Sequence, residues 1–479
     1  MKSFFTSLIL VVLFCLRGST QDTTKYTLKE CVNIALENNL RIKRSVYNIE
    51  SFNTNLLQAK AAYLPTINLG GSAANNYGRA LNPVDNQFVA RNSSNINVFG
   101  QANLNLFNGF RTQFLFRQSQ RDLSASNEDL SKAKNDIALI VITNYTNVIF
   151  NQELFSNARY QLKSSEQQLE RIKKQVAAGA LPKSNQLNQE AQVATNELNL
   201  INQENALNLS LLQLKQSMQI SGSTKMQVVV PDLSAEDLVL DKSAEDIYQV
   251  ALQAMPEVKS AMLKVESATM ALKANRGNFY PRLSLVASAQ SNYSSLSNTA
   301  RFQSDGTFSL SALPLGEVGG TGAKVFNYTP NANKISDNYG ETDQLSDNLF
   351  KALTLQLNIP VFNGLQNRTA VQRSIINREL ADITVKETQN TLRQSIETAF
   401  NDALASSKSY TSSLKQVNAQ EEAYRMNKQR FENGATSFVE YQVSENDLFR
   451  AKSDLTRAKY NFIFKKKVLD FYQGKPIDY

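Results

Sequence analysis

The chain has 479 residues, with 51 Lys and Arg against 43 Asp and Glu, and its formal net charge is +8. It contains no histidine, which excludes histidine-based general-base catalysis and removes the commonest metal ligand. The basic residues are scattered along amphipathic patterns, so we interpret them as solvated helix faces and expect no nucleic-acid partner.

The N-terminus reads as a secretory signal peptide. Lys2 is followed by an apolar run from Leu8 to Leu16 and then by small residues. This order is typical of a segment that is cleaved on export, and we assign it to residues 1–20. The mature chain then contains one cysteine, Cys31, so no intramolecular disulfide can form.

The rest of the chain is a tandem duplication. The two halves align at two fixed offsets, each over a long stretch without a gap. The pairs that coincide are Pro65 with Pro281 at the first offset, and Phe107 with Phe362, Gly109 with Gly364 and Gly179 with Gly434 at the second. We therefore divide the mature chain into a first repeat (21–220), a linker (221–243) and a second repeat (244–479).

Long helices are predicted in both repeats. Neither glycine nor proline occurs between Gly109 and Gly179 or between Gly364 and Gly434. Each interval reads as one continuous helix, and such a helix is about 100 Å long at 1.5 Å per residue. A second such run follows each interval, and shorter helices are expected at about 41–62 and 257–276. These segments alone would also fit a soluble helical bundle.

Between the helices the apolar residues alternate with a period of two. The clearest alternation has Ile96, Val98 and Leu104 on one face and Asn95, Asn97 and Asn103 on the other. Strands are predicted at about 66–77, 95–107, 282–293 and 351–362, with aromatic residues at their ends. Apolar-out, polar-in strands with aromatic ends are typical of outer-membrane β-barrels.

The second repeat is longer than the first, because the offset that separates Phe107 from Phe362 is larger than the offset that separates Pro65 from Pro281. All of the excess lies between Pro281 and Phe362, in a stretch rich in Gly, Ser and Asn. We predict a long extracellular loop at about 294–350. Four strands cannot close a barrel, because the smallest single-chain barrels use about eight and an open edge is not tolerated in lipid. The sequence therefore predicts an oligomer and leaves the number of copies open.

The pattern resembles the TolC-type outer-membrane efflux proteins over essentially the whole mature chain. The resemblance rests on doubled motifs. They are Tyr63-Leu64-Pro65 with Phe279-Tyr280-Pro281, LFNGF (106–110) with VFNGL (361–365), and VAAGALPKSN (176–185) with FENGATSFVE (431–440).

The resemblance implies an α+β membrane protein: a homotrimer with a twelve-stranded β-barrel, four strands per chain, continuous with a long α-helical barrel. It implies an outer-membrane location, with the helical duct in the periplasm. The expected partners are a periplasmic adaptor (membrane fusion) protein, an inner-membrane transporter and outer-membrane lipid. The duct would conduct exported molecules passively in a tripartite efflux or type I secretion system, without a cofactor, a metal or catalysis.

The resemblance also assigns roles to individual positions. The strand–helix junctions are Pro65, Phe107, Gly109, Pro281, Phe362 and Gly364. The adaptor-docking tips are Gly179, Ala180, Leu181, Gly434 and Ala435. The periplasmic constriction falls at Asn185, Glu440, Phe431 and Thr436, where a ring of Glu440 carboxylates could act as a cation filter. An ordinary acid in the first turn of a helix is the alternative for Glu440.

A trimeric coiled-coil surface or adhesion protein with a shared barrel is the alternative function. That architecture predicts one stalk and a single terminal barrel segment, whereas the strands here are interleaved with helices in both repeats. The sequence does not distinguish drugs, metal ions and polypeptides as the exported substrate.

Overall fold

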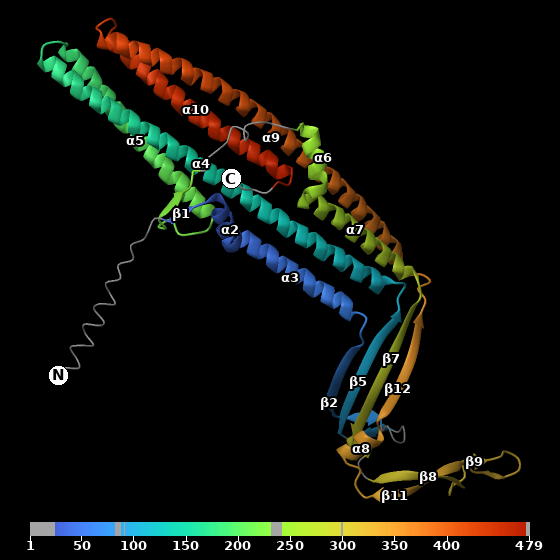
Figure 1. Cartoon of the computed structure of the whole chain (residues 1–479). Helices are drawn as coiled ribbons and strands as arrows, with labels where there is room; N and C mark the ends of the chain where they lie inside the picture. Colours follow the sequence, from blue (N-terminus) through green and yellow to red (C-terminus); the bar gives the residue numbers. More distant parts are fainter. Residues whose placement is uncertain (1–23, 82–87, 91, 231–241, 298–299, 476–479) are drawn as a thin grey trace, which may run out of the picture. The chain divides into compact units, whose positions relative to one another are not determined.

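The computed structural model describes residues 24–81, 88–90, 92–230, 242–297 and 300–475, so the predicted signal peptide lies outside the described residues. The chain divides into two compact units. The helical unit comprises residues up to 55, 119–268 and from 376 onward, and the sheet unit comprises 56–118 and 269–375. Figure 1 shows the elements of each unit along the chain.

Four helices follow one another in the same order in each half of the chain, with equal or nearly equal lengths. In the first half they are α2 (Leu28–Asn38), α3 (Leu40–Ala61), α4 (Arg111–Ala177) and α5 (Lys183–Ser217). In the second half they are α6 (Ala244–Ala254), α7 (Pro256–Arg276), α9 (Gln366–Glu432) and α10 (Phe438–Tyr472). Helices α4 and α9 each have 67 residues, and α5 and α10 each have 35. The starts of α9 and α10 are displaced from those of α4 and α5 by the second repeat offset, so the helix ends follow the duplicated sequence.

Helices α2 and α6, the first of each half, begin with the same kind of cap. Thr27 and Glu30 form a capping box at α2, in which each side chain accepts from the other residue's backbone N–H. Ser243 and Asp246, their equivalents at the first repeat offset, form the same box at α6. These boxes satisfy backbone donors that the first turn of a helix leaves unpaired, which fixes where each helix starts.

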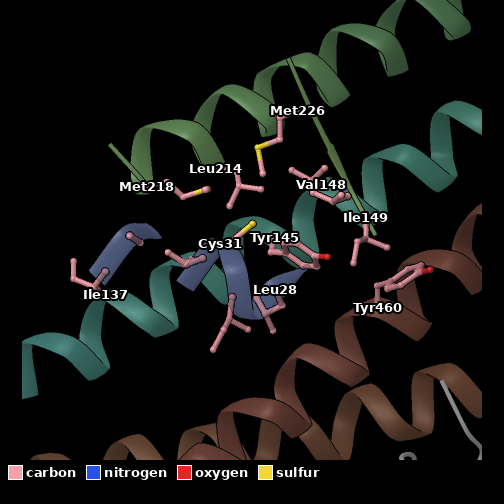
Figure 2. Close-up of a cluster of buried hydrophobic side chains, with 14 of the residues drawn as sticks. Leu28, Cys31, Ile137, Tyr145, Val148, Ile149, Leu214, Met218, Met226 and Tyr460 are labelled. Atoms are coloured by element: carbon pink, nitrogen blue, oxygen red, sulfur yellow. The ribbon is translucent and has the colours of Figure 1, made fainter. Parts of the chain in front are cut away.

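Two hydrophobic clusters in the helical unit occupy corresponding positions of the two repeats. The first surrounds Cys31 and Val141, and the second surrounds Ile247 and Ile396. Figure 2 shows the first cluster, with side chains from α2, α4, α5 and α10 and from strand β6 (Met226–Val228). In it the Tyr145 hydroxyl lies 2.7 Å from the Val229 carbonyl oxygen and 3.1 Å from that of Tyr26, and donates its hydrogen to this pair. The contact holds β6 and its parallel partner β1 (Thr24–Tyr26) against α4.

The sheet unit contains a four-stranded antiparallel sheet. Its strands lie in the order β12 (Phe350–Asn358), β7 (Arg282–Ser294), β5 (Ser93–Phe107) and β2 (Thr66–Asn76). Figure 1 shows the four strands side by side. The last strand was expected at 351–362, but it ends at Asn358, shortly before Pro360, whose missing N–H cannot join a ladder.

The segment expected as a loop at 294–350 is largely ordered secondary structure. Strands β8 (Arg301–Leu310) and β11 (Tyr328–Ser336) pair antiparallel, and the two-residue strands β9 (Gly316–Glu317) and β10 (Lys324–Val325) pair in the same way. Helix α8 (Glu341–Asp347) follows them. Composition alone does not indicate these strands, because the Gly-rich stretch also contains apolar residues, such as Leu310 and Tyr328, that pair across the hairpin. The segment still connects β7 to β12, and its extracellular position stays a prediction. A second small hairpin pairs β3 (Arg79–Leu81) with β4 (Phe88–Ala90).

Among the described helices, none combines the length and the apolar character that spanning a bilayer requires.

Candidate functional site

One face of the four-stranded sheet is mostly apolar, and its leucines on the outer strands are exposed. Directly opposed residues of an antiparallel ladder share a face, so the register identifies the members of each face. Leu69 of β2, paired with Gly100, is 85% exposed, and Leu353 of β12, paired with Ala287, is 72% exposed. Isolated exposed leucines are ordinary, but a whole sheet face of them indicates a surface that is covered by something apolar.

The opposite face is polar along all four strands, every residue of which is described. It is lined mainly by amide and hydroxyl side chains, among them Asn68, Ser72, Asn97, Gln101, Asn103, Ser284, Ser288, Asn292, Thr354 and Gln356. It has no carboxylate, and its one charged side chain is Arg282, at the start of β7. A sheet with one apolar and one hydrated face matches the predicted arrangement of an outer-membrane strand.

The outer strands of the sheet have free edges. Strand β2 pairs only with β5, and β12 pairs only with β7, within the described residues. Each edge therefore presents unpaired backbone N–H and C=O groups beside an apolar face. In lipid such groups would each cost several kcal/mol, roughly, unless another chain pairs with them.

The strand–helix junctions use consecutive left-handed residues. Gly109 and Phe110 have φ of 65° and 61°, and Gly364 and Leu365 have φ of 61° and 65°. In the first junction Asn108 accepts from the Thr112 N–H at 3.3 Å, which caps the start of α4. The other predicted junction residues lie at strand ends: Pro65 and Pro281 immediately precede β2 and β7, Phe107 ends β5, and Phe362 follows β12.

The two helical hairpins turn in the same way at Gly179 and Gly434. Both glycines have positive φ, 73° and 69°. The N–H of Ala180 donates to the Gln175 carbonyl at 2.9 Å, and that of Ala435 donates to Arg430 at 2.7 Å. Together with the bonds from the two glycine N–H groups, this is the Schellman arrangement that satisfies the last carbonyls of a helix. Ala180 and Ala435 are exposed and Leu181 is half-buried.

The predicted constriction residues fall into separate contacts. Phe431 stacks on Tyr441 with ring centroids 5.1 Å apart, inside a cluster that also contains Phe438 and Ile172. Glu440 is exposed in the first turn of α10, where its carboxylate accepts from the Thr436 hydroxyl. That geometry is also the one an ordinary first-turn acid would have. Asn185 occupies the equivalent position of α5, and its N–H donates to Pro182.

A buried carboxyl near this tip was not predicted. Glu445 is 8% exposed and accepts from the Ser164 hydroxyl of α4 at 3.0 Å. Burial raises the pKa of Glu445, and the Ser164 bond and the Lys428 charge offset this only in part. Burial likewise raises the pKa of Tyr441, one turn away. The signal that could have identified Glu445 is its place in the apolar series Phe438, Tyr441, Leu448, which repeats at helical spacing.

No metal centre is formed by the described residues: they contain no group of three or more Cys, Asp or Glu side chains that could hold an ion.

Comparisons with known proteins agree with this geometry. The family model described as outer membrane efflux protein matches residues 31–218 and 247–469, which is most of the chain. No curated protein sequence matches this chain.

Three solved structures illustrate the likeness in fold. The outer membrane protein VceC of Vibrio cholerae is 13% identical, with 94% of this chain and 97% of that chain covered and a TM-score of 0.73. A membrane protein from Pseudomonas aeruginosa is 15% identical, with 93% of this chain and 89% of that chain covered and a TM-score of 0.71. The Campylobacter jejuni CmeC outer membrane channel is 16% identical, with 94% of this chain and 87% of that chain covered and a TM-score of 0.70. The chain therefore has the α+β fold of these proteins, as the sequence predicted.

Proposed function

Because the chain belongs to the outer membrane efflux protein family, we propose that three copies of it form a closed duct through which exported molecules cross the outer membrane. It is an outer-membrane channel protein and not an enzyme. The observation that carries the proposal is the four-stranded sheet, with its open apolar face and two free edges. Three such sheets joined edge to edge would give twelve strands, with the apolar faces toward lipid and the polar faces around water.

The duplication supplies the register for the joint between copies. Gln101 of β5 pairs with Ser288 of β7 inside one chain. Shifting Gln101 forward by the second repeat offset gives Gln356 of β12, and shifting Ser288 back by the first offset gives Ser72 of β2. We therefore expect Gln356 of one copy to lie opposite Ser72 of the next, so that the joint between copies repeats the joint between the two halves.

The glycines at the junctions support the same arrangement. Gly109 contacts Gly277 within the chain, whereas Gly364, its equivalent, has nothing within 4 Å of the position where a Cβ would lie. The first repeat offset maps Gly277 onto Ala61. We infer that Gly364 packs against Ala61 of a neighbouring copy, which would give every junction a partner.

Transport through this duct would be passive, because a water-filled wall of amides and hydroxyls offers no source of energy. We propose that an inner-membrane transporter supplies the energy, in a tripartite efflux or type I secretion system, and that a periplasmic adaptor protein joins this transporter to the duct.

The proposed docking points for the adaptor are the exposed turns at Gly179, Ala180, Leu181, Gly434 and Ala435. Replacing Ala180 and Ala435 together by Trp should reduce efflux of ethidium from whole cells, while the conductance of the purified protein stays unchanged. If the double variant loses both ethidium efflux and conductance, or keeps both, the result would argue against docking at these turns.

The channel itself is tested by single-channel recording of the purified protein in a planar bilayer. We expect discrete conductance steps, with a preference for cations that is lost in Glu440→Gln if the carboxylates form a ring at the constriction. Glu432→Gln is the matched control, since Glu432 is also an exposed acid near the tip. Steps that are unaffected by Glu440→Gln would retain the duct and leave Glu440 as a first-turn acid. A folded oligomer that gives no steps would support the surface-stalk alternative instead.

A further inference from the structure

One row of the sheet breaks the rule that its polar face is made of amides and hydroxyls. The register places Gly70, Phe99, Gln290 and Phe350 directly opposite one another across the four strands. Because opposed residues share a face, both phenylalanines lie on the same side as Asn97, Gln101 and Ser288. Phe99 is 50% exposed and Phe350 is 57% exposed.

Gln290 stands between the two phenylalanine positions in this row. Strands lie about 4.8 Å apart, so the backbones of Phe99 and Phe350, which have one strand between them, are separated by roughly 10 Å. Gln290 occupies the strand between them and supplies both a donor and an acceptor. The row therefore presents two exposed aromatic rings and one hydrogen-bonding side chain, which is the chemistry that a solute with an aromatic ring and a polar substituent would contact.

The position of Phe99 is fixed by the glycine beside it. A Cβ atom on Gly70 would lie 2.5 Å from the ring carbon Cζ of Phe99. Phe99 therefore lies over the backbone of β2, where any larger residue at position 70 would displace it. The Phe99 ring thus leans toward β2, and half of the side chain stays exposed.

The wall around the row is electrically neutral. Along the four strands, all of them described, the polar face carries only the charge of Arg282, at the far end of the strand that holds Gln290. A wall of this kind does not select a solute by its charge. Aromatic faces, in contrast, attract other aromatic rings through offset or edge-to-face contacts.

We propose that Phe99, Gln290 and Phe350 form a contact site on the inner wall of the duct for the aromatic ring of an exported small organic molecule. The proposal rests on the proposed function, since it is the closed barrel that turns the polar face inward. It also names the substrate class: aromatic organic compounds, in preference to metal ions or aliphatic solutes. Three copies would place three such sites around the pore.

The test uses the purified full-length protein in a planar bilayer, with probes added on the side of the barrel's outer end. The probes are trimethylphenylammonium and tetraethylammonium, which have the same charge and differ in the aromatic ring. In the wild-type channel we expect the aromatic ion to block the current for about five to ten times longer than the aliphatic ion. Phe99→Ser with Phe350→Ser should reduce the two dwell times to the same value.

Two further variants make the outcome decisive. Phe99→Leu with Phe350→Leu keeps apolar bulk and removes the rings, so it should also lose the aromatic preference even if the serine variant fails to assemble. Val286→Ser removes an aliphatic side chain from the same face and should keep the preference. Equal dwell times in the wild-type channel, or a preference that survives in the leucine variant, would overturn the aromatic site while leaving the duct intact. Absence of any conductance step would instead count against the proposed function.

Discussion

Gly109 approaches Gly277 so closely that a Cβ atom on Gly109 would lie 2.3 Å from the Gly277 carbonyl oxygen and 2.9 Å from the Cβ of Tyr280. Gly277 is equally restricted, since its own Cβ would lie 2.7 Å from the carbonyl oxygen of Gly109. The strand–helix junction of the first repeat is thus packed, backbone on backbone, against the end of α7. This contact explains in physical terms why the motif LFNGF has glycine at its fourth position.

Gly109→Ala should destabilise the protein for two separable reasons. Alanine in a left-handed conformation costs roughly 1–2 kcal/mol, and forcing a methyl group into a filled space costs typically about 1–3 kcal/mol more. Gly179→Ala is the control for the first cost alone, because Gly179 also has positive φ but nothing within 4 Å of its Cβ position. Thermal unfolding of both variants should show a larger loss for Gly109→Ala, and equal losses would contradict the packing argument.

Glu445→Gln should change how the stability of the hairpin tip depends on pH. Since burial raises the pKa of Glu445, the folded chain holds this proton more tightly than the unfolded chain, whose pKa is near the ordinary 4.5. Between the two pKa values the folded state binds more protons, so stability falls as pH rises through that window and recovers as pH falls. The groups that face this carboxyl are Ser164, Tyr424, Lys428 and Tyr441.

Glutamine keeps an acceptor for Ser164 and removes the buried charge. We expect Glu445→Gln to raise the melting temperature by a few degrees at pH 7.5 and to flatten its pH dependence. Amide hydrogen exchange at the α9–α10 turn would locate the effect. A melting temperature that falls in Glu445→Gln at every pH would show that the carboxylate is stabilising.

Cys31 should be unreactive in the folded protein. Its side chain is fully buried in the first hydrophobic cluster, and burial raises the pKa of the thiol to about 12. At pH 8 only about one thiol in ten thousand would be the reactive thiolate. A maleimide should therefore label the native protein negligibly and the protein in guanidinium completely, whereas Ser51→Cys, at an exposed position of α3, should label at once. Rapid native labelling of Cys31 would contradict the packing shown in Figure 2.

Backbone periodicity explains what the sequence predicts well. Long intervals without glycine or proline predict long helices, and α4 and α9 fill those intervals almost to the turning glycines Gly179 and Gly434. Alternation predicts strands, and β5 coincides with the clearest alternation. The break between α2 and α3 has neither glycine nor proline. It is made by Asn39, whose side chain accepts from the Arg41 N–H at 2.8 Å, and local hydrogen bonds of this kind have no periodic signature.

The candidate site is harder to predict because its contacts join residues that are far apart in sequence. Glu445 and Ser164 are 281 residues apart, and nothing local to either position indicates the hydrogen bond. The row of Phe99 and Phe350 depends on the register of three strand pairs. Alternation places Phe99 on the polar face but cannot say which residue of another strand lies beside it. Doubled motifs did identify the family, because they preserve spacing as well as residue type.

The closure of the sheets by neighbouring copies is tested most directly by a disulfide across the proposed joint. Opposed residues of antiparallel strands have Cα atoms about 4.5–5.5 Å apart, within reach of a disulfide. The double variant Gln356→Cys, Ser72→Cys should link chains under mild oxidation into a covalent trimer on non-reducing gels, with Cys31 too buried to interfere. Each single variant should stay monomeric on the gel, as should Gln356→Cys with Asn68→Cys, which lies on the same face but well out of register. Strong cross-linking of the out-of-register pair, or none in the in-register pair from a folded oligomer, would contradict the account.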